Sequence, residues 1–179
     1  MRTSQPGPAP VPPMPPYPPA VSAASTAPPA TLVPEPFRDQ WAEMWAAHGR
    51  GDLPTAVALA SQMEVLLEDL HGPRHPYTIT MLTARAWLTL CRRTDWPATV
   101  ELLIKTALRR QAARAQPEAD TLRAARNAHA CWHVVAKRDT AAAQSLAGPL
   151  ADMLTALGLN ELRANVQGLV QAQASRTVS

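Results

Sequence analysis

The sequence predicts an all-α protein: a right-handed α-solenoid of three antiparallel helical hairpins with a C-terminal capping helix, preceded by a disordered proline-rich tail. Three observations support this. A short motif recurs, with Asp52, Asp95 and Asp139 standing 43 and then 44 residues apart. Apolar residues after Phe37 fall at spacings of three and four. Of the 19 prolines, 13 precede Phe37. A fixed period of this size is typical of stacked helical repeats.

Residues 1–36 form the predicted tail, because proline at this density removes backbone donors and blocks helices. We expect polyproline II or disordered chain there. Pro-x-x-Pro spacing occurs at Pro10–Pro13 and Pro13–Pro16. The tail is therefore either a spacer or a ligand for an aromatic-lined groove.

The repeat domain is expected over residues 37–174, with repeats at about 37–75, 76–116 and 117–158 and a cap over 160–174. In the first repeat, a helix from Phe37 to His48 ends at Gly49 and Gly51. Asp52 suits the N-cap of the next helix, and Pro54 suits its first turn. One face of that second helix is predicted to carry Val57, Ala60, Met63, Leu67 and Leu70.

The later repeats follow the same plan. Tyr77 to Arg93 is predicted helical, Asp95 caps the next helix, and Asp139 caps the sixth. Gly158 ends the sixth helix, and Gly148-Pro149 inside it should kink it. The apolar positions of the fourth to sixth helices are Val100, Leu103, Ile104, Ala107, Leu122, Ala125, His129, Trp132, Leu146, Leu150, Met153, Leu154 and Leu157.

Composition and motifs weigh against an enzyme. The seven glycines form no phosphate-binding loop, and no zinc-protease or hydrolase motif occurs. Cys91 and Cys131 lack ligand spacing and are expected to be buried free thiols. His129 and His133 share a helical face but lack a local third ligand, so no metal site is expected. We expect no cofactor, no membrane span, no secretory signal and a cytoplasmic location.

At this point the chain resembles the tetratricopeptide repeat superfamily, over about residues 37–158. Gly51-Asp52 with Ala56 and Ala60 matches the family's joint between helices, and the long period is similar to that of kinesin light chains and many bacterial proteins. The arginine-rich, lysine-poor composition suggests a bacterial source. The resemblance implies a non-enzymatic scaffold for protein–protein interaction, which holds a peptide or helix of a partner in a concave groove. Carried over by position, the groove residues are Trp41, Trp45, His48, Leu88, Arg92 and Trp132. The alternative for these tryptophans is that they form the core between repeats.

Charge suggests a second function. Residues 37–84 carry a net charge of −3, and residues 85–138 carry +7. Arg109, Arg110 and Arg114 share much of one predicted helical face and would form a basic surface. Segment 85–138 could therefore contact nucleic acid or an acidic partner, although no nucleic-acid-binding motif is present. The other interpretation is a solvated helix face.

Overall fold

The computed structural model describes residues 32–177, and within them it is helical and contains no strand. The predicted disorder of residues 1–31 lies outside the described residues. A short 3-10 helix, η2 (Glu35–Phe37), precedes seven α-helices in this part of the chain. These are α1 (Arg38–Gly49), α2 (Leu53–His71), α3 (Pro76–Arg92), α4 (Trp96–Ala112), α5 (Glu118–Arg138), α6 (Thr140–Ala156) and α7 (Asn160–Thr177). The all-α prediction is confirmed for these residues.

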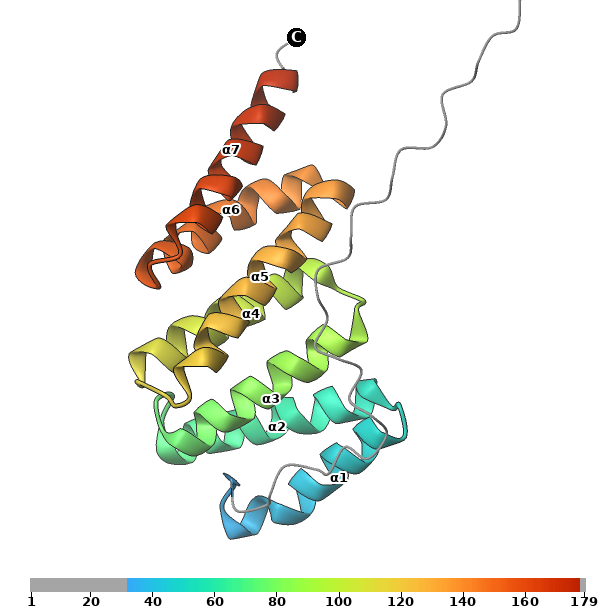
Figure 1. Ribbon diagram of the computed structural model, residues 1–179. Helices are drawn as coiled ribbons and strands as arrows, with labels where there is room; N and C mark the ends of the chain where they lie inside the picture. The colour runs from blue at the N-terminus through green and yellow to red at the C-terminus, as the bar shows by residue number, and fades with distance from the viewer. Residues whose placement is uncertain (1–31, 178–179) are drawn as a thin grey trace, which may run out of the picture.

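Each helix packs against the next one in the chain, so the helices follow one another from α1 at one end to α7 at the other (Figure 1). Contacts also skip one helix. Trp45 of α1 lies against Trp87 of α3, and His129 of α5 lies against Asn165 of α7. Helix α4 packs directly on α6. Contacts that skip one helix thus join α1 to α3, α4 to α6 and α5 to α7.

The three recurring aspartates cap helices, as predicted. Asp52 accepts a hydrogen bond from the backbone N–H of Thr55 at 3.2 Å, and its pKa is lowered chiefly by hydrogen bonds from that residue. Asp95 accepts from the N–H three residues on at 3.1 Å, and Asp139 does so at 2.9 Å. Each side chain satisfies one of the N–H groups that a helix start leaves unpaired. The period in the sequence thus corresponds to a repeated helix start.

The buried apolar side chains form two clusters that meet at α3. The first joins η2, α1 and α2 to one side of α3 and includes Met44, Met63 and Leu88. The second joins the other side of α3 to α4, α5, α6 and α7, and Trp132 lies within it. Val33 is only 2% exposed and belongs to the first cluster, so packing begins before Phe37, where the tail was predicted to end.

Two helix details differ from the prediction. Leu70 is 66% exposed, so it does not belong to the buried face of α2. That face instead carries Ala56, Ala60, Met63, Glu64 and Leu67. Leu70 lies in the last turn of α2, next to the loop that begins at Gly72, and its side chain points away from the buried face. Helix α7 also runs to Thr177, beyond the predicted cap of 160–174.

Candidate functional site

A pocket of about 410 Å³ lies where α1, α3 and α5 approach one another. Its apolar side comes from α1 and α3, and its polar side comes from α5 and the end of α4. Within the described chain its lining includes Leu32, Trp41, Trp45, Thr83, Trp87, Leu90, Arg110, Asp120, Arg123 and Asn127. Volumes of this size are usual for ligand-binding pockets in proteins.

Three indole rings form the apolar wall of this pocket. The ring of Trp45 meets that of Trp41 edge-on at a centroid distance of 5.6 Å, and that of Trp87 at 5.7 Å. His48 lies 4.8 Å from Trp87, ring to ring, and 5.7 Å from Trp45. Aromatic pairs in such geometries attract one another beyond the effect of area burial alone. Contacts between these rings therefore stabilise the arrangement of the wall.

In this wall, the indole N–H of Trp45 lacks a hydrogen-bond partner within the described chain. Its Nε1 is buried, yet among the described residues no acceptor hydrogen-bonds to it. A buried N–H without an acceptor costs free energy, which an incoming carbonyl oxygen would recover. The residues of this wall therefore include a buried indole N–H without an acceptor in the described part of the chain, in addition to their aromatic surface.

The predicted groove residues separate into two groups. Trp41 and Trp45 line the pocket, although Trp41 is only 2% exposed and mainly supports the ring of Trp45, and His48 contacts the ring of Trp87. Leu88 and Trp132 are both 0% exposed, so they cannot contact a partner on this surface. Arg92 is half-buried and does not line the pocket. Assigning Leu88 and Trp132 to the groove was therefore wrong.

Trp132 is buried because it belongs to the packing between α5 and α6. Its Nε1 donates a hydrogen bond to the carbonyl oxygen of Ala143 at 2.8 Å. Trp87, by contrast, was missed as a pocket residue. A signal for it existed in the sequence, because Trp87 stands 42 residues after Trp45, close to the spacing of the repeat.

Arg110 closes the polar side of the pocket. It is 4% exposed and donates hydrogen bonds to Thr83 Oγ1 at 3.1 Å, Thr121 Oγ1 at 3.3 Å and the Pro117 carbonyl at 3.0 Å. Burial lowers the pKa of its guanidinium, and the nearby Asp120 carboxylate, 3.9 Å away, opposes that shift. Arg110 therefore joins α3, α4 and the start of α5.

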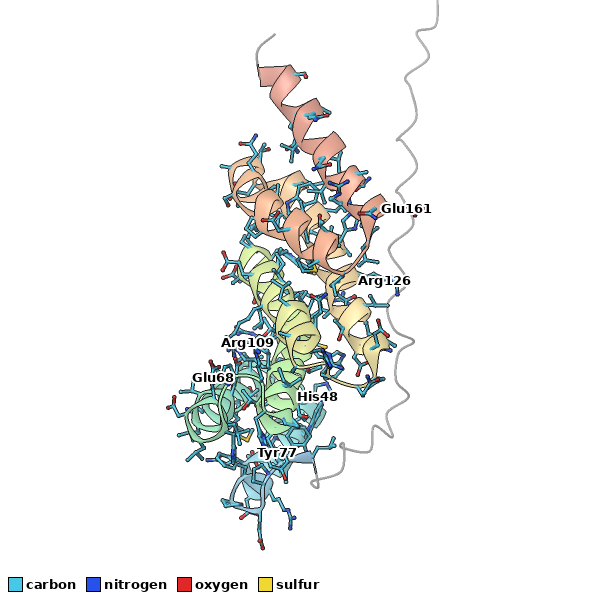
Figure 2. All side chains as sticks on the ribbon, turned by 90° about the vertical axis from the view of Figure 1, so that its left-hand side faces the viewer. His48, Glu68, Tyr77, Arg109, Arg126 and Glu161 are labelled. Atoms are coloured by element: carbon cyan, nitrogen blue, oxygen red, sulfur yellow. The ribbon has the colours of Figure 1, made fainter. Side chains whose placement is uncertain are left out.

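On the far side of α3, acidic residues of α2 meet basic residues of α3 and α4. Glu64 is 2% exposed and accepts hydrogen bonds from Arg85 at 2.6 Å and Lys105 at 2.8 Å. One turn further, Glu68 accepts a bidentate pair from Arg109 at 2.5 and 2.8 Å, and Figure 2 shows these two labelled side chains together. Arg109 lowers the pKa of Glu68, and Glu68 raises that of Arg109. We call this set the α2–α4 seam.

The predicted basic surface is not formed by its three arginines. Arg109 points to α2 and is paired with Glu68, and Arg110 is buried toward α3 and α5. Arg114 is exposed, but it lies after the end of α4, at a backbone φ of 50°. The expected shared helical face therefore does not exist, because two of the cations are used in packing between helices.

The two histidines of α5 do come together. Their Nε2 atoms lie 3.2 Å apart, and that of His129 lies 3.1 Å from Asn165 Oδ1 of α7. Burial lowers the pKa of both imidazoles. His129 also lines a cavity of about 510 Å³ with Arg126 and Glu161, which Figure 2 labels. Within residues 32–177, no group of three His, Cys, Asp or Glu side chains could hold a metal ion.

Both cysteines lie in surroundings that keep them protonated. Burial raises the pKa of Cys131 to about 11, and it also raises the pKa of Cys91. Since the thiolate is the nucleophile, neither side chain is activated at neutral pH.

Comparisons of the chain with family models, curated proteins and solved structures found no match. Among the helices that the structure describes, none is both long and apolar enough to cross a membrane.

Proposed function

We propose that this protein is a non-enzymatic interaction module, a tetratricopeptide-like right-handed solenoid that acts as a cytoplasmic adaptor in a bacterium. It binds an extended peptide of a partner in the pocket between α1, α3 and α5. The observation that supports this most directly is the wall of Trp41, Trp45 and Trp87 with its unpartnered indole N–H. Tryptophan and arginine are the residue types that contribute most to binding at interfaces.

The pocket favours an extended chain over a helix. It is a local hollow of about 410 Å³ whose wall offers aromatic faces and one donor. A helix satisfies its own carbonyl groups, whereas an extended peptide leaves them free to accept from Trp45. Its side chains can at the same time lie on the indole faces.

The alternative function, contact with nucleic acid through segment 85–138, receives less support. Five of the eleven basic side chains in that segment take part in ion pairs with Glu64, Glu68 or Asp120. Phosphate contacts need cations that are free to exchange counterions. The segment therefore offers fewer such cations than its sequence suggests.

Selection from a displayed library of random peptides on the full-length chain tests the proposal. We expect retained peptides to lose about 2 kcal/mol of binding, roughly 30-fold, on Trp87→Ala. Leu70→Ala is the matched control, because Leu70 is an exposed apolar side chain outside the pocket lining. Trp45→Phe keeps a ring but removes the N–H and should weaken binding without loss of helix.

Far-UV circular dichroism of each variant separates loss of binding from loss of fold. Peptides that bind Trp87→Ala and Leu70→Ala equally well would refute the assignment of this pocket. An absence of any enriched peptide, both with the full-length chain and with a variant whose six prolines of residues 12–19 are replaced by serine, would refute the proposed function.

A further inference from the structure

The described chain begins at the edge of the aromatic pocket. Leu32, the first described residue, is itself part of the pocket lining and is 41% exposed. The 31 residues before it are therefore joined to the described chain at this edge of the pocket.

The chemistry of that segment matches the pocket. Residues 3–31 contain no Asp, Glu, Lys or Arg, and residues 12–19 read Pro-Pro-Met-Pro-Pro-Tyr-Pro-Pro. Proline lacks an N–H but keeps its carbonyl, so such a run offers acceptors without donors of its own. The aromatic wall offers flat apolar faces, and the buried indole N–H of Trp45 within it has no acceptor among the described residues. Proline-rich chains in the polyproline II form bind aromatic-lined grooves in this way.

The geometry permits the segment to return to the pocket. Twelve residues lie between Pro19 and Leu32, so about 40 Å of polyproline II chain connects the two. Helix α1 has 12 residues and is therefore only about 18 Å long. A tether of this length keeps the proline run at an effective concentration on the order of millimolar at the pocket.

We infer that residues 12–19 occupy the pocket of their own chain and compete with the peptide of a partner. This inference rests on the proposed function and adds its regulation. The tail is then neither a passive spacer nor a ligand for another protein in the resting state. A partner binds only when its peptide displaces the tail, or when the tail is engaged elsewhere.

The test uses full-length protein and a fluorescein-labelled synthetic peptide of residues 10–19, with fluorescence polarisation as readout. In the comparison variant, the six prolines of residues 12–19 are replaced by serine, so the length and the tether are preserved. We expect this tail variant to bind the labelled peptide at least tenfold more tightly than the wild-type chain does. Trp87→Ala added to the tail variant should abolish that binding, whereas Leu70→Ala should not change it.

Several results would overturn the inference. Equal affinity of the wild-type chain and the tail variant would mean that the tail does not occupy the pocket. No binding to either chain would mean that this sequence does not fit there. Binding that survives Trp87→Ala would place the tail elsewhere. The wild-type chain could also bind the labelled peptide more weakly than the tail variant only at concentrations where sedimentation shows dimers. That result would mean that the tail occupies the pocket of a second copy. Peptide-display selection on the tail variant separates these failures from failure of the proposed function. It tests whether the pocket binds any peptide, and this does not depend on the tail sequence.

Discussion

The Glu64→Gln substitution removes one negative charge from the α2–α4 seam and preserves the shape of the side chain. Glu64 is 2% exposed and accepts hydrogen bonds from both Arg85 and Lys105. A glutamine oxygen can still accept from one of them, but its amide group then presents donors to the other cation. One charge-assisted hydrogen bond is lost, and a buried amide N–H is left without an acceptor.

The magnitude follows from the burial of the three groups. A hydrogen bond to a charged group contributes about 1.5–3 kcal/mol to stability. The side chains of Arg85 and Lys105 are 27% and 38% exposed, so both cations can recover part of their hydration when the carboxylate is gone. We therefore expect a loss of about 2 kcal/mol in the free energy of unfolding. For a chain of this size, this corresponds to a fall of roughly 4–8 °C in Tm.

Glu68→Gln is the matched control from the same seam. Glu68 and Arg109 are 31% and 26% exposed, so water screens their pair and its loss should cost less than about 1 kcal/mol. Urea unfolding followed by far-UV circular dichroism measures both variants, and repetition in 1 M NaCl should shrink mainly the Glu68 effect. If Glu64→Gln costs no more than Glu68→Gln, burial does not strengthen the Glu64 pairs and the reasoning fails.

Three further predictions concern the helices. Trp132→Phe should cost about 1 kcal/mol, because it removes the buried hydrogen bond from the indole to the Ala143 carbonyl of α6, and an unchanged urea midpoint would contradict this. Asp95→Ala and Asp139→Ala should each lower the free energy of unfolding by about 1 kcal/mol, whereas asparagine at the same positions should preserve most of it. Equal melting temperatures for the alanine and asparagine variants would refute the capping role. The lowered pKa values of His129 and His133 mean that the unfolded chain binds protons first as the pH falls. The free energy of unfolding should therefore be constant above pH 6.5, the ordinary pKa of histidine, and should decline below it. In unfolding measurements from pH 7 to pH 5, His129→Gln should make this decline smaller.

Helix starts could be predicted from the sequence because a cap depends on neighbours in the chain. An aspartate at a helix start accepts a hydrogen bond from the N–H three residues ahead. The hydrogen-bond partners of Asp52, Asp95 and Asp139 therefore lie in the same short stretch of sequence as the aspartates themselves. The same locality explains why four of the five buried apolar positions of α4 were predicted, with Leu102 as the exception. Periodicity identifies a face whenever the helix is long enough.

Which neighbour each face meets could not be predicted in the same way. Spacing places Trp132 and Trp45 on the inward faces of their helices, but it does not say that one is sealed against α6 while the other borders a pocket. Arg110 shows the same limit for charge. A helical wheel makes it a surface cation, yet the hydroxyls of Thr83 and Thr121 and the carbonyl of Pro117, just before α5, accept hydrogen bonds from it. Those acceptors are distant in sequence or lie beyond a loop.

The uneven charge of the sequence acquires a structural explanation in the seam. The acidic excess of residues 37–84 and the basic excess of residues 85–138 are adjacent in the chain, and the fold places part of each in contact. Glu64 and Glu68 lie one turn apart on α2, as their partners Lys105 and Arg109 do on α4. Two pairs at the same spacing set the register of the two helices along each other, which a single pair would leave free to slide. Arg85 also ties α3 to this seam, and α3 carries Trp87 of the aromatic wall. The charges that resemble a binding surface in the sequence therefore help to position the pocket for which we propose that role.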